Sequence, residues 1–363
     1  MHKFKITPNI VNIANEYADK VKQDATNIKA KVKLQALYEA LNNDTCVVSQ
    51  GSCRRTIIIP KPNNIYAQYV NQIITDYDSL LVAHPNLFHT IKDSYDNILD
   101  SSAKELLVRM TYTDSITNPQ EPKIYENVRF VDLIIDLLGY DTVQSSIFSD
   151  YLNKINIRTC VYCNSQYAVA TKEGAPMYEL DHFIPKSLAP YLCTSFFNLQ
   201  PTCGPCNKRK SNHEFEHGSY NLSIWKEPAD NKEDAFKFEL DKVKLAKYLV
   251  KSGIKSSDDI EVKFLPARKD ANIKLLHKDI EDHFHISSLY SQFNDIAEEV
   301  VWRHLIYTES YIDSFKARFG RLLPTIKEKA DRIILSTYSE RDEIFKRPLT
   351  KMIQDIDLQL KGK

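Results

Sequence analysis

The sequence predicts a mainly α protein in which a small α+β module is inserted between two helical regions. The chain has only 8 glycines among its 363 residues, which is few for a protein built of many tight turns. Long stretches rich in Leu, Ile, Lys, Glu, Asp and Tyr favour helices over sheets. Between Arg158 and Asn212, in contrast, five of the seven cysteines occur together with turn-forming prolines and glycines. This change of composition marks a separate small unit.

The first helical region is predicted to cover residues 1–153. Apolar residues at helical spacing between Ile10 and Val21 indicate its first helix. A short strand-like run at 56–60 ends at a proline. The helical patterns of this region lie at 8–42, 65–83, 87–108 and 126–154.

The module is predicted at residues 154–226, and the second helical region covers residues 227–363. A polar loop near Pro228 opens the second region, and helical patterns then return. These patterns lie at 268–282, 286–319, 325–337 and 340–360.

The net charge leaves nucleic-acid binding open, whereas the absence of an export signal and of a long apolar stretch argues against a secreted or membrane protein. Lys+Arg and Asp+Glu both number 48. A nucleic-acid enzyme needs only a local cationic surface, so this balance neither supports nor excludes one. The first residues lack the apolar run of an export signal, and the longest apolar stretch, 130–138, is too short to span a membrane. We therefore expect a cytoplasmic protein without a membrane partner, whose paired cysteines bind metal rather than form disulfides.

Two C-x2-C pairs, Cys160 with Cys163 and Cys203 with Cys206, predict a structural zinc site. A two-residue gap lets both thiolates of a pair reach one tetrahedral Zn²⁺, and two pairs complete four ligands. Zinc would contribute roughly 10 kcal/mol, enough to hold together a module with almost no hydrophobic core. A redox site would need only one pair. Cys193 has no such partner and is interpreted as a small apolar residue.

The segment between the two pairs carries a second pattern. It contains Asp181-His182 followed by Pro185, then Asn198-Leu199-Gln200-Pro201, and the second pair runs into Asn207 and Lys210. Over 158–212 the chain resembles the HNH, or His-Me finger, nuclease superfamily. The resemblance is strongest to members whose β-β-α finger is held by two C-x2-C pairs. It implies a zinc-stapled ββα-metal finger between the two helical regions, and a metal-dependent endonuclease activity.

Phosphodiester hydrolysis needs an activated water and a cation on the phosphoryl oxygens. An imidazole such as His182 can accept the proton of the water, and Asp181 offers a hard oxygen to Mg²⁺. The resemblance implies that Asp181 and Asn207 bind Mg²⁺ or Mn²⁺, that His182 is the general base and that Asn198 orients it. The family often has histidine where this chain has Asn207, whose amide oxygen also suits Mg²⁺. Neighbouring side chains on a strand point to opposite faces, so Asp181 and His182 meet one phosphate only if the backbone bends, as Pro185 suggests.

Cationic residues surround this pattern. Asn207 and Lys210 are three apart on a helix beginning near Pro205 and share a face, so an amide for the metal and an ammonium for a phosphate can point together. The predicted substrate-binding residues are Lys186, Lys208, Arg209 and Lys210. Lys208 and Arg209 could equally form a solvated helix face.

The histidines outside this pattern are interpreted as surface residues. His213 lies on the far side of the helix from Asn207, and His217 follows it. His277, His283 and His285 lack a matching carboxylate pattern and are not assigned as a metal site.

Three functions remain open. The first is an HNH endonuclease that cuts DNA, similar to the nuclease subunit of Septu-type phage-defence systems, which works beside an ATPase partner. The helical regions would then bind the partner or DNA, and a homo-oligomer stays open. The second is an RNA-cutting toxin, although nothing resembles a recognised RNA-binding module. The third is a non-catalytic zinc module that binds nucleic acid or protein, against which the joint presence of Asp181, His182, Asn198 and Asn207 argues.

Overall fold

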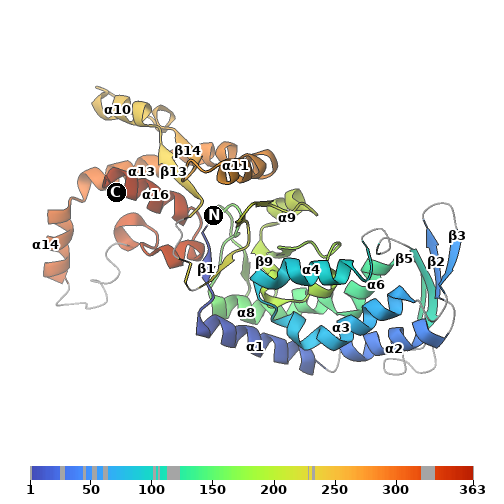
Figure 1. The fold of residues 1–363 in the computed structure, drawn as a ribbon. Coiled ribbons are helices and arrows are strands. Elements are labelled where there is room, and N and C mark those ends of the chain that lie inside the picture. Colours follow the sequence, from blue (N-terminus) through green and yellow to red (C-terminus); the bar gives the residue numbers. More distant parts are fainter. Residues whose placement is uncertain are drawn as a thin grey trace.

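The computed structural model is mostly helical, with small sheets (Figure 1). It describes residues 2–24, 29–43, 46–50, 55–59, 64–100, 104, 107–112, 123–227, 229–230, 234–319 and 332–362. In the described part of the chain, no helix is both long and apolar enough to cross a membrane.

The first region combines helices with one antiparallel sheet. Its helices are α1 (Pro8–Gln23), α2 (Ala30–Asn43), α3 (Ile65–Leu81), α4 (Phe88–Asp96), α6 (Phe130–Leu137), α7 (Tyr140–Thr142) and α8 (Phe148–Ile155). A π-helical turn, Val143–Ile147, joins the last two, and a 3-10 turn, Pro85–Leu87, precedes α4. The sheet has the order β3-β2-β4-β5, from strands β2 (Cys46–Gln50), β3 (Arg55–Ile59), β4 (Leu107–Tyr112) and β5 (Lys123–Arg129).

The predicted helices and strands of the first region agree with the structure only in part. Thr7 caps α1 by accepting a hydrogen bond from the Ile10 amide, and Pro8 occupies the first turn. The strand expected at 56–60 is confirmed as β3. The helices expected over 87–108 and 126–154 are too long, because β4 begins at Leu107 and β5 continues to Arg129.

The module consists of short strands around one helix. Its elements are β6 (Val169–Ala170), β7 (Pro176–Met177), β8 (Glu179–His182), β9 (Leu199–Thr202), α9 (Gly204–Lys210), β10 (Glu216–His217), β11 (Tyr220–Asn221) and β12 (Trp225–Lys226). Strands β8 and β9 pair antiparallel, with Asp181 opposite Gln200. The short strand β1 (Phe4–Lys5) pairs in parallel with β12, so the start of the chain is built into the end of the module.

The second region contains a pair of strands that was not predicted from the sequence. Strands β13 (Phe236–Leu240) and β14 (Val262–Pro266) pair antiparallel. The helices are α10 (Lys242–Val250), α11 (Ala271–Phe284), α12 (Ile286–Tyr290), α13 (Asn294–Ile306), α14 (Glu309–Phe319) and α16 (Thr350–Leu360). Much of the helix expected over 325–337 falls outside the described residues. The helix expected over 340–360 starts as a 3-10 turn, Arg341–Lys346, and α16 begins only after Leu349, whose φ is 62°.

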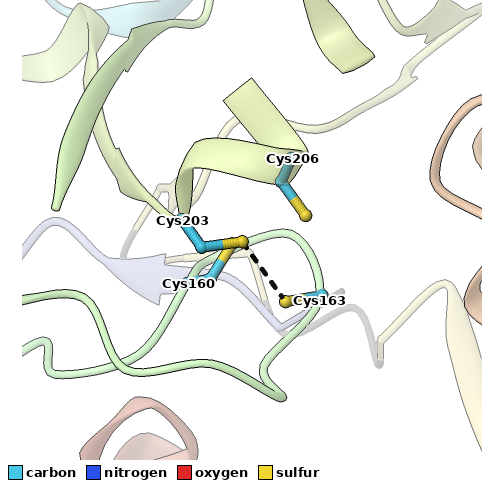
Figure 2. A group of neighbouring side chains, drawn as sticks. All are labelled: Cys160, Cys163, Cys203 and Cys206. Carbon is cyan, nitrogen blue, oxygen red and sulfur yellow. Dashed lines mark hydrogen bonds between the residues drawn. The ribbon is translucent and has the colours of Figure 1, made fainter. Parts of the chain in front are cut away.

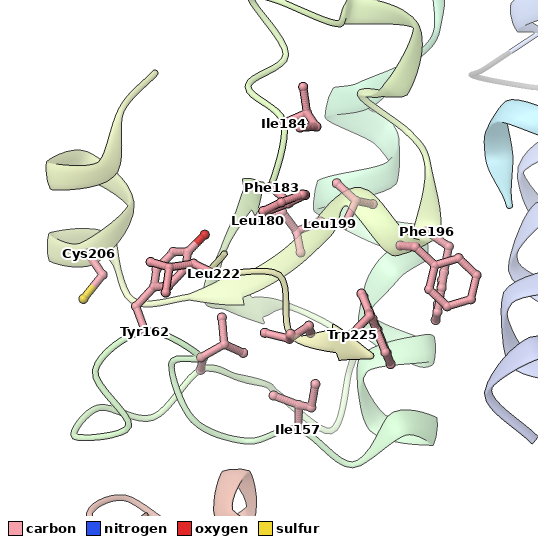
Figure 3. Packing of buried hydrophobic residues seen from close by; sticks show 14 of the residues in the cluster. Ile157, Tyr162, Leu180, Phe183, Ile184, Phe196, Leu199, Cys206, Leu222 and Trp225 are labelled. Carbon is pink, nitrogen blue, oxygen red and sulfur yellow. The ribbon is translucent and has the colours of Figure 1, made fainter. Parts of the chain in front are cut away.

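A continuous apolar core passes through the module and both helical regions. Figure 3 shows its central part, which includes Leu180, Phe196, Leu199 and Trp225. Helix α1 contributes Tyr17, whose ring centroid lies 5.5 Å from that of Phe196. The expectation of a module with almost no hydrophobic core is therefore wrong, because the flanking helices supply part of that core.

Candidate functional site

The four paired cysteines converge in a buried cluster (Figure 2). Their sulfur atoms all lie within 4.8 Å of one another, and the Sγ atoms of Cys163 and Cys203 are 3.9 Å apart. A tetrahedral zinc with bonds of about 2.3 Å requires sulfur atoms about 3.8 Å apart. The predicted cluster is thus confirmed as one that could hold a metal ion such as zinc.

Each half of the cluster is shaped by its own segment. Asn164, with a φ of 52°, turns the first segment sharply, and its amide donates to the carbonyl of Cys160 at 2.9 Å. Cys203 directly precedes α9, and Cys206 lies in the first turn of that helix. Burial raises the pKa of Cys160, whereas hydrogen bonds from the neighbouring thiols lower that of Cys163. Four buried sulfurs can all be thiolates only around a cation.

Asp181 is held in a buried ion pair with Lys210. Its Oδ2 lies 3.1 Å from Lys210 Nζ, and the two side chains are 5% and 2% exposed. Lys210 also donates to the main-chain oxygen of His182 at 2.7 Å. Burial raises the pKa of Asp181, and the Lys210 charge opposes that rise. The structure therefore places Lys210 against a carboxylate and not on an open surface.

Replacing Lys210 with methionine is expected to lower the free energy of unfolding by about 3 kcal/mol, because a buried carboxylate loses its cation. Urea unfolding at pH 7 without added magnesium measures this loss. Lys208→Met is the matched control, since Lys208 is exposed on the same helix, and its expected change is below about 0.5 kcal/mol. Equal losses in the two variants would contradict the prediction.

Glu179 is a second carboxylate on the same face of β8. It lies two residues before Asp181, and alternate residues of a strand share a face. Its Oε2 accepts a hydrogen bond of 2.6 Å from Nδ2 of Asn207. A Cβ added at Gly204 would lie 2.9 Å from Glu179 Oε1, so the first turn of α9 approaches this carboxylate closely. Two carboxylates of β8 thus meet two side chains of α9.

His182 points to the other side of the strand. It is 5% exposed, its Nε2 lies 3.0 Å from the carbonyl oxygen of Cys193, and its ring centroid lies 4.8 Å from that of Tyr140. A carbonyl only accepts, so Nε2 carries the hydrogen and Nδ1 keeps a lone pair. Among the described residues no protein group is hydrogen-bonded to Nδ1. Burial lowers the pKa of His182 to about 3, which keeps the imidazole neutral at pH 7.

The backbone changes direction immediately after His182. Strand β8 ends there, and residues 183–184 form a bend. Asn198, which is completely buried, fixes this bend because its Oδ1 accepts from the Ile184 amide at 2.8 Å. Its Nδ2 donates to the carbonyl oxygens of Ile184 and Leu192, each at 3.1 Å. Asn198 therefore positions His182 through the loop that carries Cys193, and makes no direct hydrogen bond to the ring in the described structure.

Tyr162 connects the cysteine cluster to Asp181. It lies between Cys160 and Cys163, its hydroxyl donates to Asp181 Oδ2, and it accepts from Gln200 Nε2 at 2.7 Å. The ring stacks on Phe284 of α11 with centroids 5.1 Å apart. The segment that carries two of the cysteines thus also orients the carboxylate.

The remaining cationic candidates lie nearer the surface. Lys208 and Arg209 are exposed on α9, and Arg209 Nη1 donates to the main-chain oxygen of Phe284 at 3.1 Å. Lys186 is half-buried, with its Nζ 4.2 Å from the centroid of the Tyr140 ring. Tyr140 also contacts His182, so Lys186 lies on the histidine side of the strand.

One stretch of the chain is similar to a curated protein. Over 55 residues it is 36% identical to the Septu protein PtuB of Bacillus thuringiensis. The match covers 15% of this chain and 20% of that protein, so most of both chains lies outside it. No family model and no solved structure matches the chain.

Three features of the site were missed from the sequence. Glu179 had a usable signal, because an acidic residue two positions before Asp181 on a strand must share its face. Tyr162 had no clear signal, because its position within a C-x2-C pair does not predict a hydroxyl contact. The carbonyl of Cys193 had no signal, since any residue type offers one.

The buried imidazole of His182 makes stability depend on pH. Between pH 6.5 and about 3 the unfolded chain binds a proton that the folded chain does not. This contribution to stability is therefore present above pH 6.5 and lost as pH falls, by about 1 kcal/mol from pH 6 to pH 5. Urea unfolding of wild type and His182→Gln at both pH values isolates the effect, because the other groups titrate in both proteins. An equal pH dependence in the two proteins would refute it.

Proposed function

We infer that this chain is a metal-dependent HNH endonuclease that hydrolyses phosphodiester bonds in DNA and acts in anti-phage defence. One observation carries the proposal. His182, a neutral imidazole with an unpaired Nδ1 in the described structure, ends the strand whose other face presents Glu179 to Asn207 and Asp181 to Lys210. A base and a set of hard oxygen ligands on one short hairpin suit hydrolysis of a phosphodiester.

The residues fit two kinds of cation. The four cysteines would hold Zn²⁺ as a structural ion, since four thiolates select such a metal. Asp181 and Asn207, with Glu179 beside them, would hold Mg²⁺ or Mn²⁺, which prefer oxygen ligands. When bound, this second ion polarises the phosphoryl oxygens and stabilises the leaving oxygen.

The protein itself supplies proton transfer and orientation. His182 accepts the proton of the attacking water at Nδ1, and the carbonyl of Cys193 holds Nε2–H so that the ring keeps its orientation. Asn198 fixes the loop that carries this carbonyl. Tyr162 and Lys210 hold the Asp181 carboxylate at the strand. Each of these contacts sets the geometry before substrate arrives.

Substrate and partner binding belong to the exposed surfaces. Lys186, Lys208 and Arg209 would contact the phosphate backbone, because cationic side chains bind phosphates whatever the base sequence. The similarity to the Septu protein PtuB supports a role in anti-phage defence. In such a system the chain would act beside an ATPase partner. The helical regions on either side of the finger offer the surface for that partner.

Cleavage assays with purified protein test the proposal. Supercoiled plasmid and single-stranded RNA are incubated in parallel with Mg²⁺, Mn²⁺ or Ca²⁺, using wild type and Asp181→Asn. Nicking of the plasmid by wild type alone, with Mg²⁺ or Mn²⁺, is expected. Preferential cleavage of RNA would support the toxin instead. Binding without cleavage of either substrate would support a non-catalytic zinc module.

A further inference from the structure

We propose that the chain holds a further transition-metal site, built from imidazoles and one carboxylate. It is separate from the four-cysteine cluster and from the candidate magnesium position at Asp181 and Asn207. Its ligands come from two parts of the chain that are distant in sequence. The four residues, called the histidine–aspartate cluster, are His213, His217, Asp279 and His283.

The elements that carry these residues are packed together. His213 follows the end of α9, where Ser211 has a φ of 49° and turns the chain, and His217 lies in β10. Asp279 and His283 are one turn apart on α11 and share a face. A Cβ at Gly218, whose φ is 62°, would lie 2.5 Å from Asn272 Nδ2, so the hairpin after β10 approaches α11 closely.

The cluster converges on the carboxylate of Asp279. Nε2 of His213 lies 2.9 Å from both carboxylate oxygens, and Nε2 of His217 lies 3.2 Å from Oδ2. Nδ1 of His283 lies 3.2 Å from Oδ1, and it donates to the main-chain oxygen of Asp279 at 2.8 Å, a hydrogen bond that it would give up on binding an ion. The ligand atoms of His213, Asp279 and His283 all lie within 4.8 Å of one another. Ligands that share one tetrahedral ion at about 2.0–2.2 Å lie about 3.3–3.6 Å apart, so the hydrogen-bonded atoms of the cluster would separate by a few tenths of an ångström to about 0.7 Å on binding an ion.

The chemistry of the donors selects the ion. Nitrogen-rich sets bind Zn²⁺ and its neighbours in the transition series, whereas Mg²⁺ prefers oxygen. The His213 and His283 rings stack with centroids 4.2 Å apart. Two imidazolium charges at this distance would repel each other, and the single carboxylate of Asp279 could balance only one of them. A divalent cation satisfies neutral imidazoles and the carboxylate together. The alternative without metal is a carboxylate that accepts hydrogen bonds from neutral imidazoles.

His277 and His285, which the sequence places near His283, do not join the cluster. His277 Nε2 lies 3.0 Å from the main-chain oxygen of Phe264, and His285 is exposed at the end of α11. Besides Asp279 on the same helix, the members of the cluster are His213 and His217, which precede His283 by more than sixty positions. The interpretation of His213 and His217 as isolated surface histidines is therefore replaced by a shared site.

An ion in this cluster would fasten α11 to the finger. The residue after His283, Phe284, accepts from Arg209 of α9 and stacks on Tyr162. Tyr162 in turn donates to Asp181. The proposed ion therefore lies beside a line of contacts that ends at the candidate catalytic carboxylate. Its occupancy does not depend on whether the finger is a nuclease.

Metal analysis of the whole chain tests the proposal. The variant His213→Ala/His283→Ala, reconstituted with excess Zn²⁺ and desalted, is expected to hold about one equivalent less zinc than wild type, because it removes two of the three ligands that converge on one position. His285→Asn is the matched control, because asparagine tolerates the φ of 52° at that exposed position. It is expected to hold as much zinc as wild type.

Cobalt substitution shows which site has lost its ion. Thiolate-to-cobalt charge transfer reports the four cysteines, and the double variant is expected to keep this band while losing the weaker absorption of a nitrogen–oxygen site. If the double variant loses the thiolate band, Asp279→Asn decides, since asparagine keeps the shape of the carboxylate and removes its charge. Equal zinc content in wild type and in the variant that keeps the thiolate band would overturn the proposal.

Discussion

Replacing His182 with alanine is expected to lower the rate of plasmid cleavage about a thousand-fold, the range that a general base contributes. The ring is held by the Cys193 carbonyl and Tyr140, and its Nδ1 is the free basic atom that faces no protein donor in the described residues. Removing it leaves the candidate metal ligands in place but no acceptor for the proton of the water. Single-turnover cleavage of plasmid with Mg²⁺ measures the loss.

Two controls separate chemistry from folding in this experiment. His304→Ala removes an imidazole from α13, outside the finger, and is expected to cleave at the wild-type rate. Added imidazole is expected to restore part of the activity of His182→Ala, because the small molecule can enter the space that the ring leaves. Cleavage by His182→Ala within threefold of wild type would remove His182 from the mechanism.

Replacing Cys203 with serine is expected to have the largest effect on stability. The variant should lose a large share of the roughly 10 kcal/mol that a structural zinc site contributes, because a neutral hydroxyl replaces a thiolate ligand. Tyr162 lies between two of the cysteines and bonds Asp181, so the loss should spread to the candidate catalytic carboxylate. Urea unfolding and zinc content measure both effects.

Cys193→Ala is the matched control for this prediction. Cys193 is also a buried thiol, but it lies outside the cluster, and only its main-chain carbonyl contacts His182. Its replacement should cost about 1 kcal/mol, as for removal of one small buried group, and should leave the zinc content unchanged. A Cys203→Ser protein that keeps its zinc and its stability would exclude a structural ion there.

Features that depend on short spacing could be predicted from the sequence. The two C-x2-C pairs predicted a cluster, and the structure brings their sulfurs together. The opposite directions of Asp181 and His182 followed from strand alternation, and the bend after His182 is present. Apolar and polar residues also alternate in 236–240 and 262–266, which is typical of paired strands. This pattern was not recognised because the surrounding residues are mostly polar.

Features that depend on tertiary contacts could not be predicted. Lys210 was expected to face a phosphate, yet its helix face turns towards β8 and the ammonium is buried against Asp181. His213, the stacking partner of His283, follows the end of α9 and lies seventy residues earlier, a distance at which spacing carries no information. The core of the module was underestimated because α1 supplies residues such as Tyr17 from outside it.

The pairing of β1 with β12 has a consequence for biosynthesis. Phe4 leaves the ribosome before its partner Trp225, which follows roughly 220 residues later; at 5–20 residues per second the delay is about 10–40 s. During that interval β1 has no partner strand, because β12 has not yet been synthesised. The finger should therefore close late, after most of the chain has emerged, and a nascent chain halted before residue 225 should lack a finished candidate site.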